Sequence, residues 1–155
     1  MPSVSLAVSA LHLSPGVSVC RGSRLYESPP WGGVARQAFL NAAILLHSEL
    51  CPFGLLDLCQ SIEKRLGRKV GLRWADRVLD LDLLWMEGVV QTEVGLSVPH
   101  PRLGDRLFAL RPLLELVPDA SDPEGIPYKN LLEGAGKIST AGVLACGMQA
   151  AYPRV

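Results

Sequence analysis

Two aspartates separated by one residue are the strongest chemical signal in the sequence. Asp80 and Asp82 lie in a run from Val78 to Leu84 in which acidic and apolar residues alternate. Side chains of a β-strand alternate between its two faces, so a strand here would place both carboxylates on one side, about 7 Å apart along it. Two like charges at that spacing favour a cation between them, and Mg²⁺ is suited because it takes oxygen ligands and is commonly shared with substrate phosphates. An amphipathic strand with a solvated acidic face explains the same pattern without a metal.

Basic side chains cluster just before these aspartates. Arginine binds phosphate oxygens in bidentate fashion and offsets the negative charge that builds up during phosphoryl transfer. The stretch is therefore suited to a nucleotide phosphate, although a solvated basic loop with a packed tryptophan gives the same pattern. Its basic members are Arg65, Arg68, Lys69, Arg73 and Arg77, and the tryptophan is Trp74.

The composition is that of an ordinary folded domain. The chain has 155 residues, of which 48% are hydrophobic and 19% charged, so it can bury a core and disorder is not expected. Its net charge of zero gives no support to a nucleic-acid partner. The four cysteines form no CxxC pair and no zinc-ligand spacing, and no apolar run is long enough to span a bilayer. We find no segment typical of a signal peptide and expect a cytoplasmic protein with reduced thiols and no membrane partner.

The clearest element near the aspartates is a helix expected over residues 52–66. Pro52 suits a first helical position, and Leu55 and Ile62 share one face of the helix. Gly67 stands where a glycine commonly ends a helix.

The aspartates themselves lie in an expected strand from Val78 to Met86. Glu87 and Gly88 form a turn signal, and a second strand is expected from Val89 onward, so the pattern predicts a hairpin. Strands and helices mix without a strict βαβα order, which predicts an α+β fold with a mainly antiparallel sheet. The other expected elements are a strand or helix over Ser3–Leu13, a strand over Val17–Tyr26, a loop over Ser28–Gly33, a strand or helix over Phe39–Leu50, and helices over Leu107–Leu116 and Tyr128–Leu132.

The segment from Arg73 to Asp82 resembles a known signature. Its sequence, Arg-Trp-Ala-Asp-Arg-Val-Leu-Asp-Leu-Asp, is similar to the Arg-Trp-x-x-Arg-x-Leu-Asp-Leu-Asp pattern of the 6-hydroxymethyl-7,8-dihydropterin pyrophosphokinase family. A match over ten residues is far more specific than an Asp-x-Asp pair alone. Other segments agree in the family's order and extend the resemblance over about residues 5–132: Ser23–Pro30, Phe39–Ala43, Gln60–Arg68, Val98–Pro101, Arg106–Phe108 and Pro112–Pro118.

The resemblance implies a site for two substrates and for two Mg²⁺ ions. Asp80 and Asp82 would bind the ions that bridge the ATP phosphates. Asn41 would hydrogen-bond the pterin edge, and Phe39 and Phe108 would sandwich the pterin ring. The remaining implied positions are Ser28, Pro29 and Pro30 lining the pterin pocket; Gln60, Arg73, Trp74, Ser97, His100 and Arg106 contacting ATP; and Arg68 and Arg77 assisting the transfer from mobile loops.

The implied activity is that of a kinase of folate biosynthesis, which transfers pyrophosphate from ATP to a pterin alcohol and releases AMP. The resemblance also implies a ferredoxin-like sandwich, with helices packed on the faces of the sheet, and a monomer. The pterin pyrophosphokinase domain would cover residues 1–133, and residues 134–155 would form a tail to which we assign no structure.

The beginning of the chain departs from the family pattern. The family opens with a strand and a Gly-Ser-Asn turn before its first helix, whereas Ser5–Leu13 aligns with that helix and nothing aligns with the strand. A second alignment places Leu6–Ala10 on the strand and then lacks the helix. Loss of an internal strand would leave backbone groups of its neighbours unpaired. Two explanations of the missing strand stay open, a mis-assigned start codon and a degenerate relative of the family. Two alternatives to the enzyme also stay open: a truncated, non-catalytic relative that retains nucleotide or pterin binding, and a ferredoxin-like nucleic-acid binder, which the balanced charge disfavours.

Overall fold

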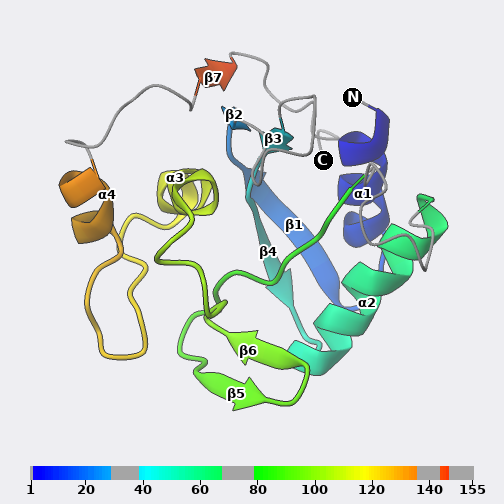
Figure 1. Ribbon diagram of the computed structural model, residues 1–155. Coiled ribbons are helices and arrows are strands. Elements are labelled where there is room, and N and C mark those ends of the chain that lie inside the picture. The colour runs from blue at the N-terminus through cyan, green and yellow to red at the C-terminus, as the bar shows by residue number, and fades with distance from the viewer. Residues whose placement is uncertain (1, 29–38, 68–78, 136–143, 147–155) are drawn as a thin grey trace.

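The computed structural model describes residues 2–28, 39–67, 79–135 and 144–146 (Figure 1). The expected α+β class is confirmed, and every ladder among the described strands is antiparallel. The elements are α1 (Pro2–His12), β1 (Val17–Gly22), β2 (Leu25–Ser28), β3 (Phe39–Asn41), β4 (Ile44–Ser48), α2 (Pro52–Arg65), β5 (Gln91–Glu93), β6 (Leu96–Val98), α3 (Leu107–Leu116), α4 (Lys129–Ala135) and β7 (Leu144–Cys146).

The described strands form three small sheets instead of the single sheet that the sequence led us to expect. β1 pairs with β4, with Val17 opposite Ser48 at one end and Gly22 opposite Ile44 at the other. β2 lies between β3 and β7, and β5 pairs with β6. The part of the chain that we left without structure thus contributes β7, which pairs with β2.

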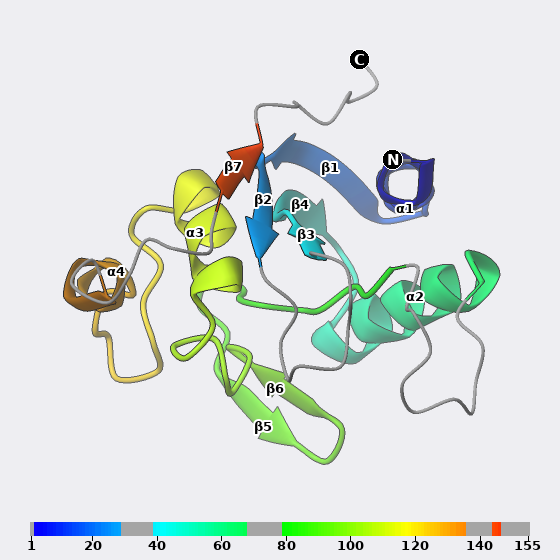
Figure 2. The same cartoon turned by 45° about the horizontal axis from the view of Figure 1, so that its top comes forward.

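The described helices lie on two sides of the β1–β4 pair. In both views α1 and α2 lie next to each other on one side, and α3 and α4 lie on the other (Figure 1, Figure 2). The first pair forms a cluster that we call the α1–α2 core, whose buried members are Ala7, Leu11, Cys59 and Ile62. A second cluster, the α3 core, has the buried members Leu103, Ala109, Leu110, Leu113, Ala120 and Tyr128. No helix in the described ranges is both long and apolar enough to cross a membrane.

The helix predicted after Cys51 forms as α2. The Cys51 sulfur accepts a hydrogen bond from the Gly54 amide at 3.4 Å, and Pro52 occupies the first turn. Gly67 follows with φ of +104°, a value that favours glycine because it has no Cβ. Helix α3 has the bounds that we predicted, and the two ambiguous segments resolve into helix α1 and the strands β3 and β4.

The strand predicted over Val78–Met86 is wrong for its described part. Residues 79–86 have no regular secondary structure, and no described strand pairs with them. Alternating side chains favour an extended chain, but a strand also needs a neighbour that accepts its backbone hydrogen bonds. The predicted hairpin is wrong in position as well, because it forms between β5 and β6, where Gly95 adopts φ of +90°. Glu87 and Gly88 do form a turn, but they join no paired strands.

Candidate functional site

The two aspartates lie on an extended segment that crosses the molecule from α2 toward α3 (Figure 2). Both Asp80 and Asp82 are exposed, whereas Leu79 and Leu81 pack against the α1–α2 core. Further along the segment, Leu84 packs against the α3 core. The alternation that we expected of a strand is therefore present, because an extended backbone points successive side chains to opposite sides even without a ladder.

Backbone and side-chain hydrogen bonds hold this segment in place. The amide of Leu81 donates to Oε1 of Glu63 at 2.7 Å. The carbonyl of Leu84 accepts from the amide of His100 at 2.8 Å, and the indole of Trp85 donates to the carbonyl of Ser121 at 3.0 Å. These bonds fix the chain on either side of Asp82.

Glu63 is a residue that sequence reasoning missed. It belongs to α2 and is only 4% exposed. A signal was present in the sequence, because Glu63 follows Cys59 by four residues and Leu55 by eight, and therefore lies on the apolar face of the helix. A carboxylate on such a face needs a buried hydrogen-bond donor, and the Leu81 amide is one.

Arg106 links the acidic segment to the first turn of α3. Its guanidinium Nη1 lies 3.8 Å from Oδ2 of Asp82, and its Cζ lies 5.9 Å from the centroid of the Phe108 ring. The Arg106 side chain is 19% exposed, whereas that of Asp82 is 56% exposed. The Arg106 Nε is buried and has no hydrogen-bond partner among the described residues. The structure therefore brings together one residue predicted for the metal, one for ATP and one for the pterin.

His100 lies close to the same residues. Its Nδ1 accepts a hydrogen bond from the amide of Arg102 at 3.1 Å, which leaves the ring proton on Nε2. Burial lowers the pKa of His100, the positive charges of Arg106 and Arg102 lower it further, and the charge of Asp82 opposes them. The imidazole is therefore neutral near pH 7 and can donate a hydrogen bond through Nε2.

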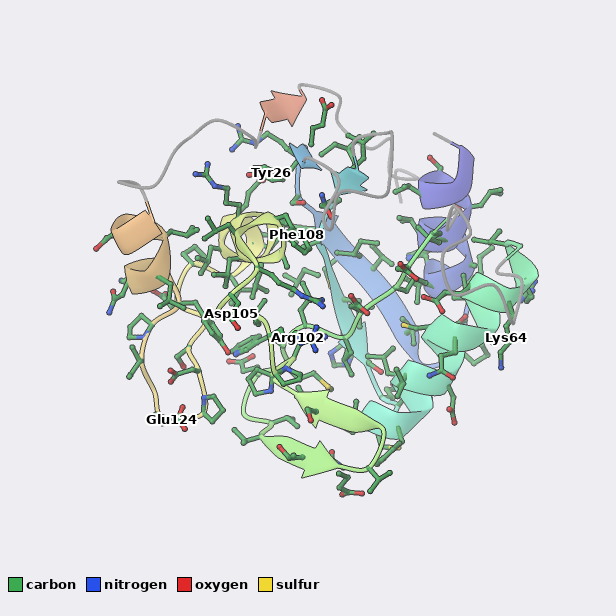
Figure 3. All side chains as sticks on the ribbon, viewed as in Figure 1. Tyr26, Lys64, Arg102, Asp105, Phe108 and Glu124 are labelled. Carbon is green, nitrogen blue, oxygen red and sulfur yellow. The ribbon has the colours of Figure 1, made fainter. Side chains whose placement is uncertain are left out.

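Asn41 lies on β3, directly opposite Tyr26 of β2. Its Nδ2 donates to the carbonyl of Tyr26 at 3.3 Å, which orients the amide group. The hydroxyl of Tyr26 donates to Oε2 of Glu115 on α3 at 2.8 Å. Figure 3 shows Tyr26 and Phe108 both close to α3, with Phe108 on the side of the helix that faces the strands. Asn41 and Phe108 thus belong to elements that pack together.

The other predicted positions are described in part or not at all. Ser28 and Phe39 are opposite each other in the β2–β3 ladder. Gln60 is exposed on α2, and Ser97 is half-buried on β6. Six predicted positions lie outside the described residues, namely Pro29, Pro30, Arg68, Arg73, Trp74 and Arg77.

The acidic segment fits a magnesium ion shared with a substrate. Asp80 and Asp82 offer exposed oxygen ligands one residue apart, which suits a hard cation. Across the described ranges, no group of three or more His, Cys, Asp or Glu side chains could hold a metal. Mg²⁺ is commonly bound through one or two carboxylates, with substrate phosphates and water completing its octahedron, so the two aspartates are a sufficient protein contribution.

Known proteins resemble this chain over most of its length. Residues 2–118 match the family model described as 7,8-dihydro-6-hydroxymethylpterin-pyrophosphokinase. A protein of Methylorubrum extorquens named 2-amino-4-hydroxy-6-hydroxymethyldihydropteridine pyrophosphokinase is 39% identical over 137 residues, which cover 88% of this chain and 84% of that protein. A protein of the same name from Bacillus subtilis is 45% identical, over 71% of this chain and 66% of that protein. Another from Pseudomonas aeruginosa is 36% identical, over 83% of this chain and 80% of that protein.

Proposed function

Because this chain belongs to the 7,8-dihydro-6-hydroxymethylpterin-pyrophosphokinase family, we propose how its residues carry out the family's reaction. The enzyme is a pyrophosphokinase of folate biosynthesis that transfers pyrophosphate from ATP to the hydroxymethyl group of the pterin and releases AMP. The observation that carries the residue assignment is the contact of Arg106 with both Asp82 and Phe108, because it joins the proposed nucleotide side to the proposed pterin side.

On the nucleotide side, Asp80 and Asp82 are the proposed ligands of two Mg²⁺ ions. Bound there, the ions would offset the negative charge of the ATP phosphates. Arg106 contributes a positive charge beside Asp82, and its loose 3.8 Å contact leaves its donors able to turn toward a phosphate oxygen. His100 donates through Nε2, which its bond to the Arg102 amide keeps protonated. The other proposed ATP contacts are Gln60, Arg73, Trp74 and Ser97.

On the pterin side, Asn41 is proposed to read the edge of the ring with its amide. The hydrogen bond to the Tyr26 carbonyl supports this role, because it fixes which way the amide points before the substrate arrives. Phe108 and Phe39 are the proposed sandwich, a use of flat apolar faces that suits an aromatic ring. Ser28, Pro29 and Pro30 are proposed to complete the pocket.

The transfer itself is a direct displacement at phosphorus. The pterin hydroxymethyl oxygen forms a bond to the β-phosphorus of ATP, the bond from that phosphorus to the oxygen bridging to the α-phosphate breaks, and AMP leaves with that oxygen. The hydroxyl proton is lost to water or to a phosphate oxygen, and no strong general base is proposed. Arg68 and Arg77 are proposed to offset the charge that develops, so catalysis rests on positioning and electrostatics.

We also propose the finer features that the family implies. They are a ferredoxin-like arrangement of the strands and helices, a monomer, and a cytoplasmic location. The antiparallel β1–β4 pair, with α1 and α2 packed on one side of it, supports the arrangement.

A coupled assay tests the proposed function. The purified protein should release AMP from ATP only when the pterin alcohol and Mg²⁺ are both present, and the pterin should gain a pyrophosphoryl group that mass spectrometry detects. AMP release without the pterin would contradict the proposed acceptor. A folded protein that binds ATP or pterin without turnover would instead support the non-catalytic alternative.

A further inference from the structure

The segment of residues 79–86 pairs with no described strand, so its orientation must come from other contacts. Close to the aspartates, one such contact comes from Glu63, whose Oε1 accepts a hydrogen bond from the Leu81 amide at 2.7 Å. Glu63 lies near the end of α2, is buried, and follows Ile62 of the α1–α2 core in the sequence. The helix is therefore a rigid support from which a buried carboxylate reaches the acidic segment.

The position of the donor matters for the two aspartates. Leu81 is the residue between Asp80 and Asp82, so its amide belongs to the peptide that joins Asp80 to Leu81. In an extended chain the direction of this N–H fixes the rotation of the segment, because successive side chains alternate about the backbone. The Leu81 N–H is bound to Glu63, and the Leu81 side chain packs against the α1–α2 core. Together these contacts hold the side chains of Asp80 and Asp82 on the exposed side.

The charge of Glu63 is close to the site as well. Burial raises the pKa of the Cys59 thiol to about 11, and the negative charges of Glu63 and then Asp82 add to that effect. Both carboxylates therefore lie near the same thiol of α2. A buried carboxylate is costly unless it is hydrogen-bonded, whereas an apolar side chain of similar size would pack in the same place at no such cost. A carboxylate at position 63 is therefore expected to have a role that an apolar side chain could not fill.

We propose that Glu63 is a positioning residue, which holds the peptide that joins Asp80 to Leu81 so that the carboxylates of Asp80 and Asp82 both face the proposed Mg²⁺ ions. The inference rests on the proposed role of the two aspartates. Glu63 touches neither substrate nor metal in this proposal and acts through the Leu81 amide.

The test compares three variants of the full chain with the wild type. Glu63→Met keeps the volume and loses the charged acceptor, and Glu63→Gln keeps an acceptor of the same shape. Cys59→Ala is the matched control, because it removes a buried side chain from the same face of α2 without touching the Leu81 amide. Calorimetry measures the Mg²⁺-dependent affinity for a non-hydrolysable ATP analogue and, separately, the affinity for the pterin alone.

We expect Glu63→Met to weaken Mg²⁺-dependent nucleotide binding by about ten- to a hundredfold, the loss typical of a hydrogen bond to a charged group. Its pterin affinity should stay within about twofold, because Asn41 and Phe108 are on other elements. Glu63→Gln should recover nucleotide binding to within about threefold of the wild type, since it restores the acceptor. Cys59→Ala should lower the unfolding temperature and leave both affinities unchanged.

Three results would overturn the proposal. Unchanged nucleotide binding in a folded Glu63→Met protein would do so, and so would an equal loss in Cys59→Ala, which would make the effect one of packing alone. Should Glu63→Met not fold, amide hydrogen exchange in the wild type decides instead, because a Leu81 amide that exchanges as fast as an unprotected one would refute the bond. A wild type without any Mg²⁺-dependent nucleotide binding is a separate outcome, which removes the role of Asp80 and Asp82 and the inference with it.

Discussion

The chain around Asn41 and the chain around Asp82 are both extended, but different interactions hold them in place. Asn41 is in a strand ladder, its side chain is bonded to the Tyr26 carbonyl, and Tyr26 is bonded in turn to Glu115 of α3. Asp82 is in no described strand, and the amide of the preceding residue, Leu81, is bonded to the Glu63 carboxylate of α2.

This difference affects how each region should respond to mutation. A ladder spreads its restraint over several backbone bonds, so the loss of one side chain changes the strand little. A segment held by a few separate contacts gives each contact more influence on where its side chains point. We therefore expect single changes near Asp82 to have larger effects on function than single changes near Asn41.

The largest effect is expected for Asp82→Ala. Loss of a metal ligand should lower kcat by on the order of a thousandfold or more, because charge on the transferring group is no longer offset. The fold should persist, since the Asp82 side chain is 56% exposed. Steady-state AMP release and thermal unfolding measure the two properties. Asp57→Ala, a matched change at an exposed residue of α2, should leave kcat as it is. An Asp82→Ala enzyme as active as its parent would rule out the metal role.

A smaller and more selective effect is expected for Asn41→Ala. Without the side-chain amide, pterin affinity should fall about tenfold, which corresponds to one lost hydrogen bond at the upper end of the usual range. ATP affinity should not change, because the β2–β3 ladder keeps the strand in place. Calorimetric titration with each substrate measures both affinities, and Asn130→Ala, at an exposed position of α4, is the matched control. Equal weakening of both substrates would count against the assignment.

The next change, Tyr26→Phe, tests the support of the pterin-side strands. It removes the hydroxyl that donates to Glu115 at 2.8 Å and should lower the free energy of unfolding by about 1 kcal/mol. Arg24→Ala breaks the ion pair with the same carboxylate and should cost less, because the Arg24 side chain is 58% exposed and water competes for it. Urea unfolding measures both. If Tyr26→Phe instead abolished pterin binding, the strands beside the pterin would depend on a single contact. They would then be no better supported than the segment around Asp82.

The smallest effect is expected from the titration of His100. Burial and then Arg106 lower the pKa of His100 below its ordinary value of 6.5, so the unfolded state binds a proton at a higher pH than the folded state. The contribution of His100 to stability is therefore present above pH 6.5 and is lost as the pH falls from there toward the folded-state pKa. The unfolding free energy of the ligand-free wild type should fall over this range more steeply than that of His100→Asn. Parallel curves for the two proteins would show that the ring is not desolvated.

Much of the fold follows from local sequence signals. Pro52 and Gly67 mark the two ends of α2, and the apolar spacing over Leu107–Leu116 marks α3, because helix formation depends on neighbours within a few turns. The segment at Leu79–Met86 has the alternation of a strand without the ladder, since a ladder depends on a partner from elsewhere in the chain. The real hairpin forms seven residues later around Gly95, although Gly88 gave an equally good turn signal.

The site was less accessible to sequence reasoning. The signature around Asp80 and Asp82 identified the acidic pair, but it said nothing of Glu63, which meets Leu81 across 18 residues of sequence. The link from Tyr26 to Glu115 spans 89 residues and carries no local pattern. Long-range contacts of this kind depend on how the helices pack, which no single stretch of sequence specifies.

The acidic segment also contributes to both hydrophobic clusters, since Leu79 and Leu81 enter the α1–α2 core and Leu84 and Trp85 enter the α3 core. A nucleotide bound at the aspartates would stabilise a segment that both clusters need in order to be complete. By linkage, the binding free energy of the nucleotide then adds to the stability of both hydrophobic clusters rather than to that of one cluster alone. The two clusters should consequently melt as separate cooperative units more readily in the empty enzyme, and as a single unit once substrate is bound.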